Sequence, residues 1–298
     1  MSNHHHTSFL SFSCIKFISI GLLSSCATDA LESYDSEPKA IEATAVKASN
    51  NPYQLLELND SDWKLQVPIA SNSYSCSGKS FNAGVLNISN TSLKTYSHSS
   101  YFKAYDSNSV EFTTPGNANT TSCNTTGTRT ELRQNTEWNT NGGNTRTLKI
   151  KMRITQFSDS KQIGFTQIHT GNDDLFLILA QRITSNSSQF YLRMRGDAVK
   201  LGADKLDSNG YVLNSNGDRL KYSMNTAYEL KVSSGNNRIK VQIKNSAGSF
   251  YSLYDEPTLK DSSTAHFKAG CYILNNADGS GQKGGTAKIR FYTVDYDS

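Results

Sequence analysis

In Leu148-Lys149-Ile150-Lys151-Met152-Arg153-Ile154, apolar and basic side chains alternate without a break, and this pattern indicates the kind of fold that the chain adopts. Successive side chains of a β-strand point to opposite faces, so the pattern predicts a strand with one buried and one exposed face. The same alternation recurs at 190–195, 228–232, 239–243 and 288–291. Five such runs in one chain favour an all-β protein.

Turn-forming residues separate these runs. Clusters of Asn, Gly, Ser and Asp lie at 141–144, 208–210, 215–218, 234–237 and 278–281. Helical patterning is scarce, and we expect a single short helical turn within 53–58. The 298-residue chain is 36% hydrophobic, which is enough for a core and excludes general disorder. Many short strands joined by polar turns predict one domain, built as a sandwich or a barrel.

The first 25 residues differ from the rest of the chain. An apolar run from Phe9 to Leu23 is shorter than a typical membrane-spanning helix and fits a signal peptide. It ends in Leu23-Ser-Ser-Cys26, which resembles the bacterial lipobox, whose cysteine is lipidated and becomes the mature N-terminus. We therefore expect residues 1–25 to be a lipoprotein signal, and the protein to be exported and held at a membrane only through Cys26, in the periplasm or at the cell surface. The alternative is an ordinary signal peptide and a secreted protein.

Residues 26–50 are acidic and lack an apolar period, which is typical of a flexible tether. They leave 51–298 as the folded domain. The whole chain carries +4, the signal holds one lysine and the tether carries −3, so the domain carries +6. A basic domain suits a polyanion. Nucleic acid is disfavoured, because the sequence has no basic helical stripe, zinc spacing or RNA-binding aromatic motif.

Five cysteines occur in the chain. Cys14 lies in the signal, Cys26 is the lipidation candidate, and Cys271 lies on the apolar face of its predicted strand as a buried thiol. Cys76 and Cys123 remain, both in polar loop-like surroundings, as a candidate disulfide in an oxidising compartment. Two free thiols are the alternative. No cysteine or histidine spacing indicates a metal site.

Three polar strings direct the same kind of chemistry to one face of the predicted sheet. They are Arg129-Thr-Glu131-Leu-Arg133, Gln167-Ile-His169 and Phe267-Lys268-Ala-Gly-Cys-Tyr272. A face of this composition is costly to bury, so we expect it to line a wet cleft, where it suits an anionic substrate and a proton transfer. By alternation the residues on this face are Arg129, Glu131, Arg133, Gln167, His169, Lys268 and Tyr272.

These strings resemble the motifs of alginate lyases of polysaccharide lyase family seven, R-(T/S)-E-(L/V)-R, Q-(I/V)-H and Y-F-K-A-G-x-Y-x-Q, in this order. The first two match in full, and the third departs at His266 and Leu274, where the family usually has Tyr and Gln. Trp63-Lys-Leu-Gln-Val-Pro68 and the closing run 287–294 are similar to the two ends of family domains. The resemblance implies a two-sheet β-jelly roll with alginate lying across its concave sheet. We expect the protein to be a monomer.

Cleavage of a uronate polymer without water requires β-elimination, in which the C-5 proton leaves once the neighbouring carboxylate is neutralised. Arg129 and Gln167 fit that neutralising role, with Arg133 as a further cation and Glu131 orienting both guanidinium groups. His169 is the expected base, since it is largely neutral at working pH. Tyr272 is the expected proton donor to O-4, with Lys268 lowering its pKa. This scheme needs no metal and no cofactor.

Three residues of another run, Tyr191, Arg193 and Arg195, alternate outward and are candidates for outer substrate-binding positions. Ile168, in the middle of Q-I-H, favours guluronate-containing blocks by the resemblance. Two other functions stay open: a carbohydrate-binding jelly roll without turnover, and a lyase for another polyuronate such as glucuronan, which the departures at His266 and Leu274 allow.

Overall fold

The computed structural model of the chain describes residues 50–58, 63–69, 86–116, 127–171, 173–203, 205–274 and 284–297. The predicted signal peptide, the tether up to residue 49, and the cysteines Cys26, Cys76 and Cys123 lie outside these residues. The predictions about them therefore remain predictions. Within the described part of the chain, no helix is long and apolar enough to cross a membrane.

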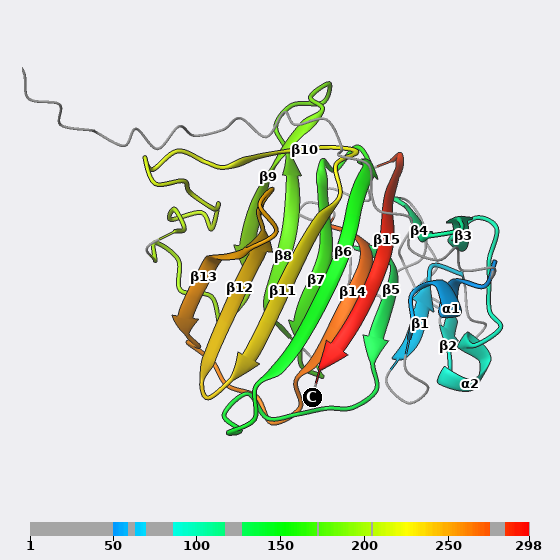
Figure 1. Cartoon of the computed structure of the whole chain (residues 1–298), viewed down its shortest axis with the longest axis horizontal. Helices are drawn as coiled ribbons and strands as arrows, with labels where there is room; N and C mark the ends of the chain where they lie inside the picture. The colour runs from blue at the N-terminus through cyan, green and yellow to red at the C-terminus, as the bar shows by residue number, and fades with distance from the viewer. Residues whose placement is uncertain are drawn as a thin grey trace, which may run out of the picture. The chain divides into compact units, whose positions relative to one another are not determined.

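Two antiparallel β-sheets pack face to face, accompanied by two one-turn helices, α1 (Pro52–Leu55) and α2 (Asn90–Leu93) (Figure 1). The eight-stranded sheet has the order β10-β9-β8-β7-β14-β5-β1-β2. Its strands are β10 (Lys221–Ser223), β9 (Gln189–Arg195), β8 (Asp174–Arg182), β7 (Gln162–His169), β14 (His266–Ile273), β5 (Thr128–Gln134), β1 (Trp63–Val67) and β2 (Leu86–Ile88). The seven-stranded sheet has the order β13-β12-β11-β6-β15-β4-β3. Its strands are β13 (Phe250–Pro257), β12 (Arg238–Lys244), β11 (Tyr228–Gly235), β6 (Arg146–Gln156), β15 (Thr286–Asp297), β4 (Ser109–Pro115) and β3 (Phe102–Asp106).

The core lies between the sheets because each strand turns its apolar side inward. In β6, Leu148 and Ile150 are fully buried, whereas Lys149 and Lys151 point outward. Aromatic rings fill the interior, and Phe112 of β4 meets Phe291 of β15 edge to face at a centroid distance of 4.8 Å. Each fully buried side chain of this size contributes about 1.5–3 kcal/mol to folding. The expected two-sheet jelly roll is confirmed.

The predicted strands and the predicted helical turn are present. The five alternating runs lie within β6, β9, β11, β12 and β15, and α1 overlaps the expected turn at 53–58. The 234–237 cluster forms the tight turn between β11 and β12, where Asn236 and Asn237 have φ of 52° and 56°. Asparagine tolerates this left-handed conformation, which the tight hairpin turn requires at both positions.

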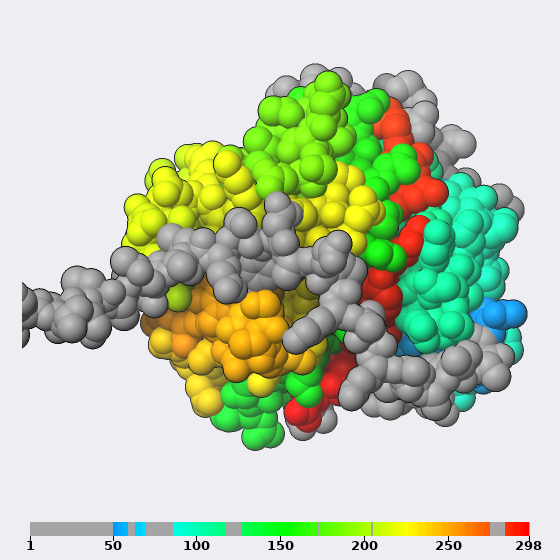
Figure 2. All heavy atoms as spheres, turned by 45° about the horizontal axis from the view of Figure 1, so that its top comes forward, coloured from blue at the N-terminus to red at the C-terminus, as the bar shows by residue number. Residues whose placement is uncertain are grey.

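The last two strands of the chain occupy the middle of the two sheets. β14 lies between β7 and β5, and β15 lies between β6 and β4 (Figure 1). In Figure 2 the red atoms of β15 form a band between the green of β6 and the blue-green of β3 and β4. Each sheet therefore becomes continuous only through a strand that comes last in sequence.

Candidate active site

The three polar strings lie side by side, because β14 pairs with β5 on one edge and with β7 on the other. Residues directly opposite each other on paired strands share a face. Lys268 is opposite both Arg133 and Gln167, which places all three strings on one face of the eight-stranded sheet. Tyr272 is opposite Arg129, and His266 is opposite His169. We call this surface the polar face.

Glu131 is the centre of a buried charge cluster on the polar face. Its carboxylate is fully buried and lies 3.5 Å from Nη1 of Arg129 and 4.0 Å from Nζ of Lys268. The amide of Gln167 donates a hydrogen bond to its other oxygen. A buried carboxylate persists as an anion only with such partners. The expected contact of Glu131 with Arg129 is present, and it holds the guanidinium near the strand.

The cluster is drier than we expected. Arg129, Glu131, Gln167 and Lys268 are each at most 6% exposed, so these four do not line an open wet cleft. A single charged side chain would be costly to bury, but here charged side chains on neighbouring strands neutralise one another, which makes their burial tolerable. The amide oxygen of Gln167 and Nε of Arg129 have no hydrogen-bond partner among the described residues.

Gly270 makes room for this cluster. It is opposite Glu131, and a Cβ at position 270 would lie 2.4 Å from the carbonyl oxygen of Thr130 and 2.5 Å from Cα of Glu131. Backbone atoms cannot withdraw from such a contact without distorting the strand. The glycine in Lys268-Ala-Gly-Cys-Tyr272 therefore has a steric role beneath the polar face.

Arg133 is held by partners other than Glu131. Its Nε donates to Nε2 of His266 over 3.0 Å, and its Nη2 lies 3.0 Å from Oε1 of Glu137. The expectation that Glu131 orients Arg133 is therefore not met. His266, which stands where the family usually has tyrosine, is 1% exposed and accepts this hydrogen bond. Burial, reinforced by the charge of Arg133, lowers its pKa to about 2, so the ring is neutral and can accept.

His169 lies near the cluster and is partly exposed, with 17% of its side chain accessible. Burial, followed by the charge of Lys268, lowers its pKa to about 4, so the imidazole is neutral above that pH. Its Nδ1 contacts the carbonyl of Thr170, which fixes the proton on Nδ1 and leaves Nε2 free to accept one. Nε2 lies 3.4 Å from Oδ1 of Asp174, a carboxylate placed to stabilise the imidazolium that forms.

Lys268 lies deep beside His169 with 5% of its side chain exposed. Burial, followed by the charge of Arg129, lowers its pKa to about 7. The Lys268 ammonium is therefore charged below neutral pH and loses its charge as the pH rises through about 7.

Tyr272 is partly buried, and its ring packs against residues from several strands. The guanidinium of Arg129 lies over its ring at 4.3 Å from the centroid. A Cβ at Gly127 would meet the ring at 2.3 Å, and one at Gly164 would meet it at 3.3 Å, so two glycines accommodate the ring. An apolar cluster of Leu177, Leu179 and Leu274 completes its surroundings.

This packing changes the acidity of Tyr272. Burial raises the pKa of its hydroxyl, and the opposing effect of Arg129 is smaller. The expected lowering of this pKa by Lys268 is wrong, because burial of the hydroxyl dominates and the positive charges that oppose it are those of Arg129 and Arg195. The hydroxyl stays protonated at neutral pH and can donate.

Six positions of β14 separate Tyr272 from His266, the residue opposite His169. At about 3.3 Å per residue, less one residue for a bulge, the Cα atoms of Tyr272 and His169 are roughly 16–20 Å apart. The two side chains must reach towards each other to act on one sugar. Lys268, opposite Gln167, is much nearer to His169.

The strand register also places the candidates for outer substrate-binding positions on the polar face. Leu177 is opposite both Gln167 and Arg195, and Leu179 is opposite Arg193. Tyr191, Arg193 and Arg195 therefore point to the same side, as alternation with the buried Phe190, Leu192 and Met194 predicts. The Nε of Arg193 donates to the carbonyl of Asn209 over 2.7 Å, so this arginine is partly engaged.

Several residues of the polar face were not among the predicted site residues. Lys64 and Gln66 of β1 are opposite Arg133 and Glu131, and their alternation with buried Trp63 gave a usable signal. Asp174 gave no signal, because its approach to His169 follows a register shift between β7 and β8. Among the described residues, no group of three or more His, Cys, Asp or Glu side chains is placed to hold a metal ion.

The comparisons with known proteins agree with this geometry. Residues 56–298 match the model of a protein family described as alginate lyase. Alginate lyase AlgAT5 of polysaccharide lyase family 7 is 24% identical with a TM-score of 0.61, covering 84% of this chain and 99% of that chain. The alginate lyase from Klebsiella pneumoniae is 17% identical with a TM-score of 0.65, covering 83% and 98%.

A variant of alginate lyase A1-II′ in complex with substrate (GGMG) is 18% identical with a TM-score of 0.54, covering 84% of this chain and 97% of that chain. At these identities the solved structures demonstrate a shared fold. No curated protein matches the chain.

Proposed function

The chain belongs to the alginate lyase family, and from this membership we propose that it cleaves alginate by β-elimination at the polar face, leaving an unsaturated uronate end. The observation that carries the proposal is a neutral, partly exposed His169 beside a buried cluster that holds two cationic side chains. The reaction needs a base next to groups that stabilise a carboxylate as negative charge develops on it.

Carboxylate binding is assigned to Arg129, Lys268 and Gln167. Glu131 holds the first two within 4.0 Å of its own carboxylate, so they meet the substrate already oriented. Prepositioned donors stabilise the enolate-like transition state without a further cost of reorganisation. Arg133, with 18% of its side chain exposed, adds a more accessible cation.

His169 is assigned as the base that takes the C-5 proton. Its free Nε2 accepts the proton, and Asp174 then stabilises the imidazolium. General bases of this kind contribute about 10²–10⁴-fold to the rate.

Tyr272 is assigned as the acid that protonates the departing O-4, since its hydroxyl is protonated at neutral pH. A second candidate for this proton is Lys268, which the register places nearer to His169 and whose pKa of about 7 suits a group that both gives and regains a proton. Kinetics of Tyr272→Phe separate the two. If Tyr272 is the donor, this variant loses turnover while substrate binding survives, whereas retained turnover would assign the proton to Lys268.

The direct test is ultraviolet absorbance of the new C4=C5 double bond during incubation of purified protein with alginate. A steady rise is expected. No rise with alginate or any other polyuronate, together with retained binding, would leave the carbohydrate-binding jelly roll as the function. A rise with glucuronan alone would favour the other polyuronate lyase.

The preferred uronate is proposed to be guluronate. The support is Ile168, which is fully buried and acts on Gln167 and His169 only through packing. Initial rates on polyguluronate and polymannuronate decide this point, and faster cleavage of polymannuronate would contradict it.

For location we propose an exported lipoprotein anchored through Cys26, with Cys76 and Cys123 joined as a disulfide in an oxidising compartment. The support is the apolar run that ends at the Leu-Ser-Ser-Cys string and the two cysteines in polar surroundings.

A further inference from the structure

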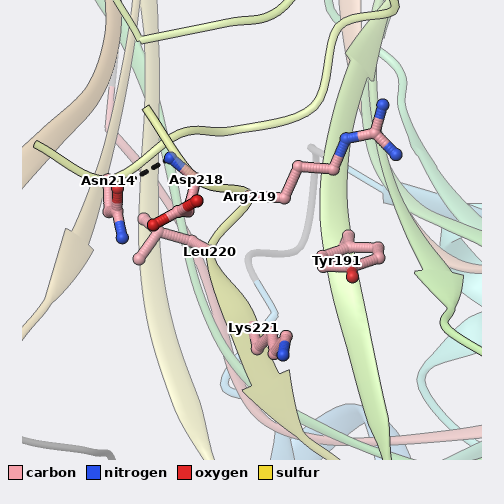
Figure 3. A pocket seen from close by; sticks show the side chains of 6 residues that line it. All are labelled: Tyr191, Asn214, Asp218, Arg219, Leu220 and Lys221. Atoms are coloured by element: carbon pink, nitrogen blue, oxygen red, sulfur yellow. Dashed lines mark hydrogen bonds between the residues drawn. The ribbon is translucent and has the colours of Figure 1, made fainter. Parts of the chain in front are cut away.

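A pocket of about 640 Å³ lies at the β9–β10 end of the polar face, away from His169. Figure 3 shows the side chains that line it. Tyr191 comes from β9, Lys221 from β10, and the rest from the segment that leads into β10. The lining residues are Tyr191, Asn214, Asp218, Arg219, Leu220 and Lys221.

Lys221 and Tyr191 are directly opposite each other on paired strands. Lys221 is exposed, and among the described residues no carboxylate forms an ion pair with it. Its ammonium is therefore available to a bound anion. The neighbouring aromatic ring offers an apolar face of the kind on which a sugar ring stacks, so the pair provides both halves of a site for an acidic sugar.

The other charges of the pocket support this assignment. Arg219 is already neutralised, since its Nη2 lies 2.8 Å from Oδ2 of Asp207 and its guanidinium covers the ring of Tyr211 at 3.9 Å. Asp218 repels a carboxylate, and it lies with Asn214 at the end of the pocket away from Tyr191 (Figure 3). An anionic ligand is therefore directed to Lys221.

Asn214 supplies a donor for a sugar hydroxyl. Its side-chain oxygen accepts from the backbone N–H groups of Asn216 and Asp218, both over 2.9 Å. This fixes the orientation of the amide and leaves its NH₂ group directed elsewhere.

The pocket and the reaction centre lie on the same face of the eight-stranded sheet. The register runs from Tyr272 across Gly164 and Leu179 to Arg193, and Tyr191 lies two residues before Arg193 on β9. Three interstrand spacings of about 4.8 Å separate β14 from β9, or about 14 Å. A pyranose unit in a polysaccharide is about as long as one such spacing, so a chain crossing the strands places roughly one sugar on each.

We propose that this pocket is a distal subsite for a uronate of the same alginate chain, about three sugars from the bond that is cleaved, in which Lys221 binds the carboxylate and Tyr191 stacks on the ring. The assignment rests on the proposed function. It makes affinity depend on chain length, because only a long substrate reaches both the reaction centre and β10.

The test compares Lys221→Met with Lys231→Met, which removes the same charge from the outer face of the other sheet. Lys221→Met should raise KM for polymeric alginate about two- to fivefold, as loss of one exposed ion pair does, with kcat unchanged. KM for an alginate trisaccharide should stay at the control value. The difference in polymer KM between Lys221→Met and Lys231→Met should shrink as the salt concentration is raised, since salt screens an exposed charge pair.

Tyr191→Leu should give the same dependence on chain length, but without the salt effect, because it removes stacking rather than charge. If Lys221→Met has the same KM for polymeric alginate as Lys231→Met, the proposed subsite is wrong. It is also wrong if Lys221→Met raises KM for the trisaccharide as much as KM for the polymer.

If wild-type protein gives no unsaturated product from alginate, the proposed function fails instead. Affinity electrophoresis in alginate-containing gels then still tests the pocket, with weaker retardation of Lys221→Met expected and equal retardation contradicting it.

Discussion

His169 and Tyr272 have separate roles in the proposed reaction, and conservative variants test them one at a time. His169→Ala and Tyr272→Phe should each lower kcat about 10²–10⁴-fold, because each removes a proton-transfer group. Neither change opens a core cavity, so thermal unfolding should stay close to that of the wild type. The measurement is the initial rate of unsaturated product, with His98→Ala and Tyr292→Phe as controls outside the polar face.

Near-wild-type turnover by either variant would remove that residue from the mechanism. For Tyr272→Phe this result would transfer the proton-donor role to Lys268, since that side chain lies nearer to the base.

Lys268 predicts an alkaline decline in activity. Its pKa of about 7, against an ordinary 10.5, means that free enzyme loses this positive charge as pH rises through about 7. Because kcat/KM reports free enzyme, it should fall above that pH. The decline in kcat should come at higher pH, because a bound uronate carboxylate stabilises the ammonium.

The pH profile of Lys268→Met checks this assignment. Its activity should be low and should lack the decline near pH 7, whereas Lys151→Met on the outer sheet should keep the wild-type profile. A decline that survives unchanged in Lys268→Met would assign it to another group.

His266 predicts sensitivity of the fold to acid. Its pKa is about 2 in the folded protein against an ordinary 6.5, so below pH 6.5 the unfolded chain binds a proton that the folded protein does not. Stability contributed by the neutral ring is thus complete above pH 6.5 and is lost as pH falls. Between pH 6.5 and 5 the loss amounts to up to about 2 kcal/mol.

Urea unfolding at pH 7 and pH 5 measures this effect. His266→Phe should show a smaller loss between the two pH values than wild type, and His98→Ala should not. An equal loss in His266→Phe and wild type would show that other groups cause the acid sensitivity.

In β14, Gly270 is the position where the strand is least tolerant of change. Gly270→Ala should destabilise the protein by about 2 kcal/mol or more, because the added Cβ meets backbone atoms of β5 rather than a movable side chain. It should also lower activity by displacing Glu131. Gly143→Ala is the matched control, since nothing lies within 4 Å of a Cβ there. Equal melting temperatures of the two variants would contradict the steric role.

The strands differ in how far their own sequences reveal them. β6 is predictable because one of its faces meets the core and the other meets solvent. β8 has no such pattern, since Leu175 to Ala180 are all buried. Leu177 and Leu179 point to the otherwise polar face, where Leu274 and Tyr272 cover them. Local alternation cannot predict this, because the covering residues come from a distant strand.

In the candidate site, too, some features follow from the sequence of one strand and others depend on distant strands. Alternation correctly assigned Arg129, Glu131 and Lys268 to one face, because that depends only on the period of a strand. Their burial and pKa values depend on how three strands bring charges together, and no single string contains this information. The partnership of Arg133 with His266 depends on the same pairing.

For the molecule as a whole, the proposed lipid anchor predicts where the activity is found. Cys26→Ser should move the protein from the detergent-extracted membrane fraction to the soluble fraction, because two acyl chains anchor stably and none remain. Activity on soluble alginate should not change, since the tether separates Cys26 from the domain. Fractionation followed by the absorbance assay measures both. Wild-type protein found entirely in the soluble fraction would rule out the anchor.

The central positions of β14 and β15 also determine when activity can first arise during synthesis. A ribosome that has not yet released residues 266–297 has produced a chain whose two sheets are each divided in the middle. Such a chain lacks Lys268 and Tyr272 and has no surface that brings β5 and β7 together. Pairing of strands so distant in sequence is also slow, so folding follows rather than accompanies translation. A prematurely terminated product that lacks these two strands is therefore expected to have no catalytic activity.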